Sequence, residues 1–387
     1  MVARRTFPRD LESTLVRSAR AFPAVVLTGP RRAGKTHLLR AAFPRASYHL
    51  LEDPDELARV RADPRAWLDD LVLPAIIDEI QNAPELLPYI RSRIDRAPRR
   101  VGQWLLTGSQ DFALMAGVTE SMSGRAAILH LLPLSSMELG RWDLIRGGFP
   151  EVWLRPRAAA QWFSSYIQTY LERDVRAVTA VRDLTTFRTF LSLVASRSGQ
   201  MLNKTDLAAP LGVSVPTITQ WLGVLETTGL LLVVRPYFEN FGKRLVKTPK
   251  VYLADTGLLC HLLGLATQRA LEQSPFVGPV FEAFVAQELV KQQIHHGRAR
   301  ELYYFRDEQG LEVDFVVPHG AGLQFVEAKW SKTVVPKDAR GIEALLRARG
   351  GRAGQGFVVH RGGVTGTALV PGVKAVTLTE LLAFTGS

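Results

Sequence analysis

The first third of the chain alternates short apolar runs with amphipathic stretches. The apolar runs predict strands at residues 24–28, 47–51, 75–78, 104–107 and 127–132. The stretches between them have the spacing of helices that bury one face. Strands that alternate with helices form parallel sheets. We therefore predict a parallel α/β domain for residues 1–142.

Helical periodicity takes over after the Gly-Gly-Phe-Pro segment at residues 147–150. It predicts amphipathic helices at 157–176 and 184–196. A short helix capped by Asn203, a turn at 211–214 and a helix at 215–227 follow, with Ile218, Leu222 and Leu225 on one face. Strands are expected at 230–235 and 251–254. This order is typical of a helix-turn-helix with a wing, so we predict a helical linker and a winged-helix domain at 143–268.

The loop between these two strands is rich in basic residues, which are Arg235, Lys243, Arg244, Lys247 and Lys250. We expect such a wing to contact DNA phosphates. Thr217, Thr219 and Gln220 would face a groove, but this face lacks Arg and Lys, which disfavours base readout. A second interpretation keeps the winged helix as a lever that packs only against protein.

The last third predicts a small α/β domain at 269–387. An amphipathic helix carries Glu282 and Glu288, and a strand follows at 301–306. The segments 311–317 and 323–329 read as a hairpin with Asp314 on one strand and Glu327 and Lys329 on the other. Because side chains alternate along a strand, Glu327 and Lys329 share a face that Asp314 can reach.

Composition sets limits on the protein. A chain of 387 residues is too long to fold around one hydrophobic core, so we expect two or three domains. Its net charge of +11 predicts binding to polyanions, and DNA is the first candidate. The single Cys260 lies in an apolar stretch and is expected to be a buried thiol in a reducing cytoplasm. No uninterrupted apolar run is long enough to span a bilayer, so we expect a cytoplasmic protein with no membrane partner.

The loop after the first predicted strand reads GPRRAGKT and fits the phosphate-binding pattern GxxxxGK(S/T). Its backbone N–H groups would cradle the phosphates of ATP. Lys35 would reach the β- and γ-phosphates, and the Thr36 hydroxyl would ligate Mg²⁺. We expect nucleotide contacts from Gly29, Pro30, Arg31, Arg32, Ala33, Gly34, Lys35, Thr36 and His37.

Two further strand ends, and a loop before the last predicted strand, carry candidate catalytic groups. Asp78 fits the Mg²⁺ site and Glu79 fits a general base, and the Asp-Glu pair favours hydrolysis over phosphoryl transfer to another substrate. Ser109 could hold the γ-phosphate or the attacking water, although a plain turn explains it nearly as well. Arg125 could act as a finger on a neighbouring copy, or it could form a surface or internal ion pair.

These residues carry a resemblance to the AAA-type ATPases of bacteria and archaea. The chain shares with that family the GPRxxGKT loop, the Ile-Asp-Glu-x-Gln strand end at 77–81 and Thr-Gly-Ser at 107–109. Gly124-Arg125 and Pro-Leu-Ser at 133–135 also match. Gly-Gly-Phe-Pro-Glu at 147–151 and Tyr-Leu-x-x-Asp-Val at 170–175 match as well. In that family these two segments belong to the second half of the chain, whose function is unassigned. The resemblance implies a P-loop AAA-type sheet followed by a winged-helix domain and a nuclease-like domain, with ATP and Mg²⁺ as cofactors and Ser109 as the sensor.

The C-terminal pattern resembles Holliday-junction resolvases and restriction enzymes in Glu282, Asp314, Glu327 and Lys329. In that fold Asp314 and Glu327 would ligate Mg²⁺, and Glu282 would complete the coordination shell of the metal. Lys329 would orient the nucleophile. The departure is that no Pro precedes Asp314. Edge strands decorated with charges, or a domain that only binds DNA, remain as alternatives.

Three functions follow from these patterns. The first is a Mg²⁺-dependent ATPase that acts on DNA, with branched or broken DNA as a candidate substrate and hydrolysis moving the later domains. The second is an ATP-gated, metal-dependent nuclease. The third is an ATP-dependent signalling switch with a protein partner that the sequence does not name. Self-assembly depends on whether Arg125 acts in trans.

Overall fold

The computed structural model describes residues 7–108, 121–171, 184–238, 246–350, 353–363 and 366–386. The chain divides into two compact units. The first unit contains Met1–Leu134 together with Thr227–Gly229 and Ile294–Arg298. The second unit contains Ser135–Glu226, Leu230–Gln293 and Ala299–Ser387.

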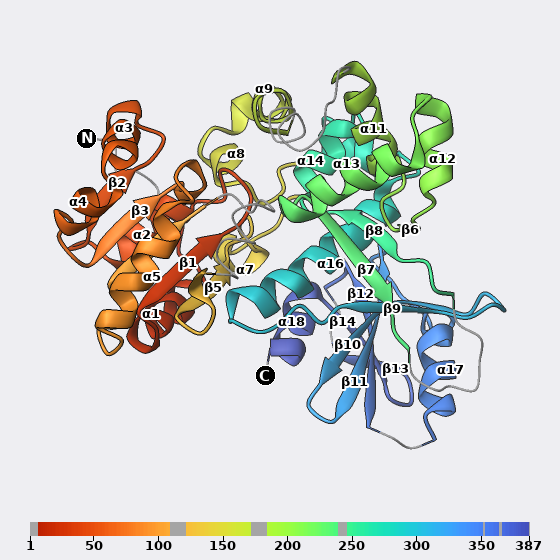
Figure 1. Cartoon of the computed structure of the whole chain (residues 1–387). Helices are drawn as coiled ribbons and strands as arrows, with labels where there is room; N and C mark the ends of the chain where they lie inside the picture. The colour runs from red at the N-terminus through yellow and green to blue at the C-terminus, as the bar shows by residue number, and fades with distance from the viewer. Residues whose placement is uncertain are drawn as a thin grey trace. The chain divides into compact units, whose positions relative to one another are not determined.

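The first unit is built on a five-stranded sheet in the order β2-β3-β4-β1-β5 (Figure 1). Its neighbouring strands all run parallel. The strands are β1 (Ala24–Thr28), β2 (Ser47–Leu50), β3 (Ala75–Asp78), β4 (Trp104–Thr107) and β5 (Ala126–His130). The predicted parallel α/β sheet is thus confirmed, with strand ends that differ by at most two residues.

Helices cover both faces of this sheet because its strands are apolar on both sides. Val26, Ile77 and Leu106 share a core with helices α3, α4 and α5. Val25, Ile76 and Leu105 pack on the other side with α1 and α2. These helices are α1 (Glu12–Ala21), α2 (Lys35–Ala42), α3 (Pro54–Ala62), α4 (Pro64–Asp69) and α5 (Leu86–Arg96), and η1 (Ile80–Asn82) follows β3.

The second unit contains a nine-stranded sheet in the order β13-β14-β12-β11-β10-β9-β7-β8-β6 (Figure 1). Strands β7 and β9 pair in parallel, so the sheet runs across the boundary predicted at residue 268. The strands are β6 (Gln200–Met201), β7 (Leu231–Pro236), β8 (Lys250–Leu253), β9 (Tyr303–Arg306), β10 (Glu312–His319), β11 (Gly322–Lys329), β12 (Gly354–His360), β13 (Thr367–Val370) and β14 (Val373–Val376).

The helices of the middle region follow the predicted pattern. The Asn203 side chain accepts hydrogen bonds from the backbone N–H of Thr205 and Asp206 and so caps α12 (Lys204–Ala208). In α13 (Val215–Thr227) the predicted apolar face is buried. The other helices here are α7 (Ser136–Leu139), α8 (Pro150–Leu154), η2 (Pro156–Ala158), α9 (Ala159–Tyr166), the π-helix η3 (Ile167–Leu171), α11 (Leu184–Ser196), η4 (Ala209–Leu211), α14 (Thr256–Leu262) and α15 (Gln268–Glu272). The helix predicted at 157–176 extends outside the described residues.

The C-terminal part of the second unit packs helices against the β10–β11 hairpin. The hairpin register pairs Phe315 with Val326. Ile342 and Leu345 of α17 share a buried core with Val313, on β10. The helices are α16 (Val277–His295), η5 (Pro336–Ala339), α17 (Arg340–Ala348) and α18 (Leu378–Gly386). Among the described helices, we find none with the length and apolar character to cross a membrane.

Candidate functional site

The phosphate-binding loop has a backbone that glycine makes possible. Gly29 and Gly34 have φ values of 139° and 100°, and Arg32 also lies in the left-handed region at 64°. A Cβ atom on Gly29 would lie 2.2 Å from the carbonyl oxygen of Leu131. The loop therefore follows β1 in a conformation that a side chain at position 29 would block. Helix α2 begins directly after it at Lys35.

Lys35 and Thr36 lie where this loop meets the carboxyl ends of the strands. Lys35 is buried, and its Nζ donates to the carbonyl oxygens of Gly29 (3.0 Å) and Pro30 (3.1 Å). The Thr36 hydroxyl donates to both carboxylate oxygens of Asp78, at 3.1 and 2.8 Å. The structure thus brings together the loop and the acidic strand end that the sequence singled out separately.

Two further hydroxyl groups hold the Asp78 carboxylate. Tyr48 donates to Oδ2 at 2.7 Å, and Thr107 donates to Oδ1. Strand β3 lies between β2 and β4, so its terminal Asp78 is flanked by one side chain from each neighbour. Burial, together with the hydrogen bond to Asp78, raises the pKa of Tyr48. Sequence reasoning missed Tyr48 and Thr107, because only the strand order shows that they flank Asp78.

Glu79 has an unusual backbone conformation for a non-glycine residue. Its φ and ψ are 60° and 48°. Such a conformation costs on the order of 1–3 kcal/mol and is concentrated at functional sites. The Glu79 N–H donates to the Thr107 hydroxyl at 3.1 Å, and the Gln81 side-chain amide donates to its carboxylate. The chain therefore turns sharply after Asp78, where Thr107 holds the Glu79 backbone and Gln81 contacts the Glu79 carboxylate.

Arg9 supports the loop from a distant part of the sequence. Its buried guanidinium donates to the carbonyl oxygens of Ala33 (2.7 Å) and Leu132 (2.6 Å). A Cβ on Gly34 would lie 3.4 Å from the Arg9 Nη1 atom. Arg9 thus joins the loop to the segment after β5, and no local sequence pattern marks it.

The remaining residues predicted for the nucleotide site have different surroundings. Arg31 lies 3.8 Å from Glu52, and His37 is exposed on α2. Arg125 forms an ion pair with Asp95, with contacts of 2.5 and 3.1 Å. It precedes β5 and so lies at the edge of the parallel sheet opposite the loop. Ser109 lies outside the described residues, and its role as a sensor stays a prediction.

A second cluster of charged residues lies in the second unit and contains the four residues of the nuclease-like pattern. The Asp314 carboxylate accepts a hydrogen bond from the backbone N–H of Ala328, between Glu327 and Lys329 (2.9 Å). Lys329 pairs with Glu327 at 2.8 Å. Glu282, from α16, accepts a hydrogen bond from the Tyr252 hydroxyl at 2.6 Å. We call these residues, with Lys250 and Glu312, the carboxylate cluster.

Lys250 joins Glu282 to the hairpin. Its Nζ lies 2.5 Å from Glu312, 3.1 Å from Glu282 and 3.9 Å from Asp314. The sequence placed Lys250 among the basic residues of a wing that contacts phosphate. This expectation is wrong, because Lys250 is the first residue of β8 and is only 3% exposed. Lys243 and Arg244 lie outside the described residues.

Burial and mutual repulsion govern the protonation of the cluster. Burial first, and the Asp314 charge second, raise the pKa of Glu282 to about 7 and that of Glu327 to about 8. Burial also raises the pKa of Asp314. For Lys250, burial alone would lower the pKa, but the surrounding carboxylates, with Glu282 first, hold it above its usual value. The lysine therefore keeps its charge, while the acids tend to bind protons.

A cavity of about 680 Å³ opens beside this cluster, within the second unit. Lys250 and Glu312 belong to its wall, and Arg306 pairs with Glu312 at 2.7 Å. The wall also carries two basic side chains from the helical region, Arg197 and Lys204. Apolar residues such as Val194 and Leu222 complete it. The cavity therefore combines apolar surface with several basic groups.

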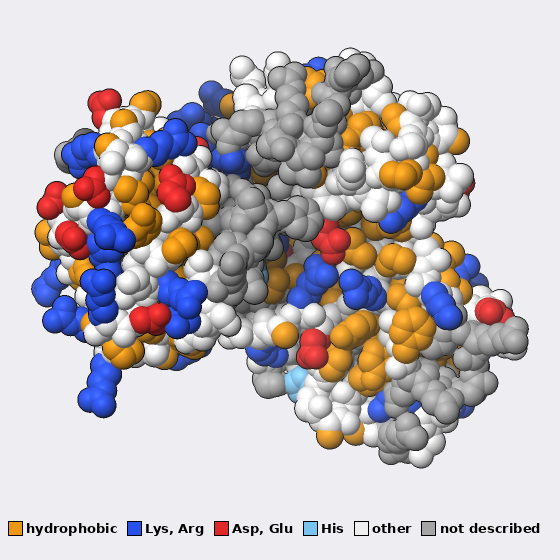
Figure 2. All heavy atoms as spheres, viewed as in Figure 1, with side chains coloured by type: hydrophobic (Ala, Val, Ile, Leu, Met, Phe, Trp, Pro, Cys, Tyr) orange, Lys and Arg blue, Asp and Glu red, His pale blue; other side chains and the backbone are white. Residues whose placement is uncertain are grey.

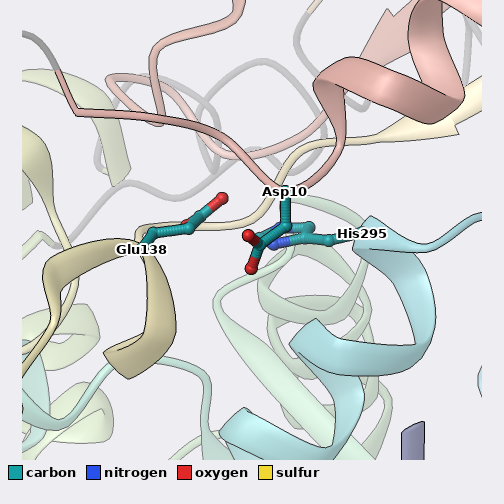
Figure 3. Close-up of side chains that lie close together, drawn as sticks. All are labelled: Asp10, Glu138 and His295. Atoms are coloured by element: carbon teal, nitrogen blue, oxygen red, sulfur yellow. The ribbon is translucent and has the colours of Figure 1, made fainter. Parts of the chain in front are cut away.

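Asp10 and His295 of the first unit also lie close together (Figure 3). Their nearest ligand atoms are within 4.8 Å of each other, and His295 Nε2 accepts the backbone N–H of Leu132 at 3.2 Å. Glu138, which the same figure labels, belongs to the second unit and there accepts the N–H of Ser135 as part of the cap of α7. Because a protein metal site needs about three ligands or more, we assign no metal to the Asp10–His295 pair.

Three families match successive parts of the chain. Residues 21–140 match the family described as AAA domain. Residues 141–269 match a domain of unknown function (DUF8612), and residues 277–380 match another (DUF4143). The matched AAA segment contains the phosphate-binding loop and the Asp78-Glu79 strand end.

Two curated relatives span most of the chain. They are the uncharacterized proteins Mb2031c of Mycobacterium bovis and Rv2008c of Mycobacterium tuberculosis. Each is 33% identical over 349 residues, which cover 87% of this chain and 77% of the relative. The chain belongs to the AAA-type ATPases that carry these C-terminal domains. The family inferred from its motifs is thereby confirmed.

A solved structure is similar to this AAA-type ATPase over a large part of its length. The Walker-type ATPase PABY2304 of Pyrococcus abyssi is 15% identical, with a TM-score of 0.42, and the match covers 66% of this chain and 96% of that one. The fold class of the AAA-type ATPase follows from its own sheet, which has five parallel strands with the phosphate-binding loop after β1.

Proposed function

We propose that this AAA-type ATPase binds ATP with Mg²⁺, hydrolyses it, and uses the hydrolysis to act on DNA through the second unit. The observation that carries the proposal is the convergence of Thr36 and Asp78 beside Lys35 at the carboxyl edge of the parallel sheet. Ligands of open α/β sheets bind at this edge. Branched or broken DNA remains our candidate substrate.

The residues present fit the nucleotide and its metal ion. The Thr36 hydroxyl and the Asp78 carboxylate lie within 3.1 Å of each other, and both are the oxygen ligands that Mg²⁺ prefers. The left-handed glycines let the loop backbone approach phosphate closely. When bound, Mg²⁺ neutralises charge on the β- and γ-phosphate oxygens.

In the proposed reaction, each side chain has one task. Lys35 would exchange its contacts with the loop carbonyls for contacts with phosphate oxygens. Glu79 would hold the attacking water and accept its proton. The Thr107 hydroxyl accepts the Glu79 N–H and donates to Asp78. It would therefore hold the general base Glu79 and the metal ligand Asp78 in fixed positions relative to each other.

Substitution of Lys35 and Glu79 tests hydrolysis directly. Lys35→Met should lose ATP affinity by about 100-fold or more, because it removes a charge-assisted phosphate contact. Glu79→Gln should bind ATP normally and lower the hydrolysis rate by about 100-fold or more. Matched controls are the exposed Lys337→Met and Glu85→Gln. If Glu79→Gln hydrolyses ATP at the unaltered rate, Glu79 is not the base.

The proposal that DNA is the substrate rests on charge. The chain has a net charge of +11, and Arg235 and Lys247 are exposed beside the β7–β8 connection. We propose that α11–α13 with β6–β8 form a winged helix and that these bases contact phosphates. On the face of the first unit visible in Figure 2, basic and acidic side chains are interspersed. We assign DNA contact to the second unit because Arg235 and Lys247 lie there and the cavity adds Arg197 and Lys204.

Salt dependence tests the DNA proposal. Affinity for duplex and four-way-junction DNA should fall steeply with salt, because phosphate neutralisation releases counterions. The variant Arg235→Ala with Lys247→Ala should reduce the salt slope by about one per lost contact. Lys337→Ala with Arg340→Ala, at exposed positions, is the control. A flat slope, together with an ATP hydrolysis rate that no single-stranded, duplex or junction DNA changes, would exclude DNA as the substrate.

An ATP-gated nuclease is the alternative function. The convergence of Glu282, Asp314, Glu327 and Lys329 in one cluster favours it. Divalent-metal-dependent nicking that Asp314→Asn abolishes would support it. Lys250, inside the same cluster, argues against it.

A further inference from the structure

The carboxylate cluster contains a cation supplied by the chain itself. The side chain of Lys250 is 4% exposed, and its ammonium nitrogen lies 2.5 Å from Glu312 and 3.1 Å from Glu282. The nearer Asp314 oxygen is 3.9 Å away. Two of these carboxylates come from β10 and one from α16, so they reach the ammonium from different elements. Lys250 is therefore enclosed by acidic groups in the way that a protein-bound cation is.

A divalent metal does not fit among the same groups. Mg²⁺ needs oxygen ligands at about 2.0–2.1 Å in a near-octahedral arrangement. The ammonium already contacts Glu282 and Glu312 and lies close to Asp314, and a second cation at that position would be repelled by it. Glu282 and Asp314 of the metal-binding pattern therefore face a position that is already filled.

Further hydrogen bonds and ion pairs hold these carboxylates, although Oε2 of Glu327 is buried and accepts no hydrogen bond from the described residues. The Oε1 atom of Glu282, which already contacts Lys250, also accepts the Tyr252 hydroxyl at 2.6 Å. The second oxygen of Asp314 accepts the N–H of Ala328 at 2.9 Å. Glu327 pairs with Lys329 at 2.8 Å. A metal would have to displace several of these contacts at once.

The charges of the cluster nearly cancel. Its four carboxyl groups, on Glu282, Glu312, Asp314 and Glu327, lie among three cations, on Lys250, Lys329 and Arg306, which offset all but one of the negative charges. Little uncompensated charge is left to attract a divalent ion.

We propose that the Lys250 ammonium permanently takes the place of the divalent cation in this nuclease-like cluster. The second unit then holds no catalytic metal there and does not cleave DNA by this site. The cluster instead fastens β8, from the middle region, to β10 and α16. The adjacent cavity, with Arg197, Lys204 and Arg306 in its wall, remains suited to hold phosphate without cutting it.

Manganese binding to the full chain tests this proposal. Free Mn²⁺ is measured by electron paramagnetic resonance as the nucleotide-free protein is titrated, for the unaltered chain and for Asp314→Asn. Any Mn²⁺ held near Thr36 and Asp78 is present in both and cancels in the comparison. We expect the same number of bound ions in both proteins. One more ion in the unaltered chain than in Asp314→Asn would overturn the proposal.

A Lys250→Gln variant tests it from the other side. Removing the ammonium leaves its carboxylates without their cation, so this variant should take up one additional Mn²⁺, which Asp314→Asn should abolish again. If Lys250→Gln folds and binds no additional ion, Lys250 does not fill a cation position. If it fails to fold, the comparison of the unaltered chain with Asp314→Asn still decides. Metal-dependent nicking by the unaltered chain that Asp314→Asn abolishes would also overturn the proposal.

Discussion

Two buried lysines, one in each unit, serve opposite purposes. Lys35 and Lys250 are 5% and 3% exposed. Lys35 donates to the backbone carbonyls of its own loop, which are neutral and which a phosphate oxygen can replace. Lys250 faces carboxylates, whose negative charge is opposite to its own. The partners of a buried lysine therefore indicate whether it can bind an incoming anion or is already committed to the fold.

Replacing each lysine by methionine should give the largest difference between the two sites, measured as the loss in free energy of unfolding. Lys250→Met should lower the free energy of unfolding by about 3–5 kcal/mol, because it leaves buried carboxylates without their cation. Lys35→Met removes hydrogen bonds to the neutral loop carbonyls, and we expect a loss of about 1–2 kcal/mol. Urea unfolding of both variants measures the difference. Equal losses would show that the two lysines do not differ in the way described.

The stability of the second unit should depend on pH through the buried acids. The folded-state pKa of Glu327 is raised to about 8, so the folded protein holds a proton that the unfolded chain releases above its ordinary value of 4.5. Stability is therefore highest below that ordinary value and falls as pH rises toward 8. We expect a loss of about 3–4 kcal/mol between pH 5 and pH 8.

Glu327→Gln should flatten this decline, because the glutamine cannot ionise. Urea unfolding at pH 5, 6.5 and 8 measures the effect, and the exposed Glu85→Gln of the first unit is the control. An unchanged slope in Glu327→Gln would mean that Glu327 titrates normally in the folded protein.

Arg9 should affect the nucleotide site without touching a nucleotide. Arg9→Ala leaves the carbonyl oxygens of Ala33 and Leu132 without this donor, which we expect to cost about 1–2 kcal/mol of stability. ATP affinity should fall by about tenfold, because the loop loses its support behind Gly34. Arg20→Ala, at an exposed position of α1, is the control. Isothermal titration with ATP, together with urea unfolding, would detect both changes, and unaltered affinity would restrict Arg9 to a structural role.

Substitution of Arg125 should have the smallest effect, and the quantity measured is the ATP hydrolysis rate. It pairs with Asp95 at the sheet edge opposite the loop, so Arg125→Ala and Asp95→Ala should both leave the ATP hydrolysis rate unchanged. A finger acting on a neighbouring copy would instead contribute about 10³–10⁵ to the rate. In that case only Arg125→Ala would lose activity, and mixing it with Lys35→Met would restore it.

The sequence predicted correctly those features of this protein that are determined by a few consecutive residues. The five strands of the first unit, the cap at Asn203 and the loop before Lys35 follow from short segments. Alternation along one strand also placed Glu327 and Lys329 together. Each of these depends on a few consecutive residues and on the geometry of one element.

Residues whose partners are remote in sequence could not be found in this way. Arg9 contacts a carbonyl 123 residues away, and Lys250 meets a glutamate 32 residues away. Tyr48 reaches Asp78 only because β2 lies beside β3. The burial of Lys250 had no local signal either, since its charge suggested an exposed wing. Strand order and tertiary packing decide these contacts.

The pairing of β7 with β9 has a consequence for how this protein can be divided. The matches to the two domains of unknown function end at residue 269 and begin at 277, yet the hydrogen-bonded ladder passes from Arg235 and Pro236 to Tyr303 and Tyr304. A fragment cut between them would expose an open strand edge on each piece, and such edges promote aggregation. The two segments should therefore be inherited, expressed and purified as a single piece.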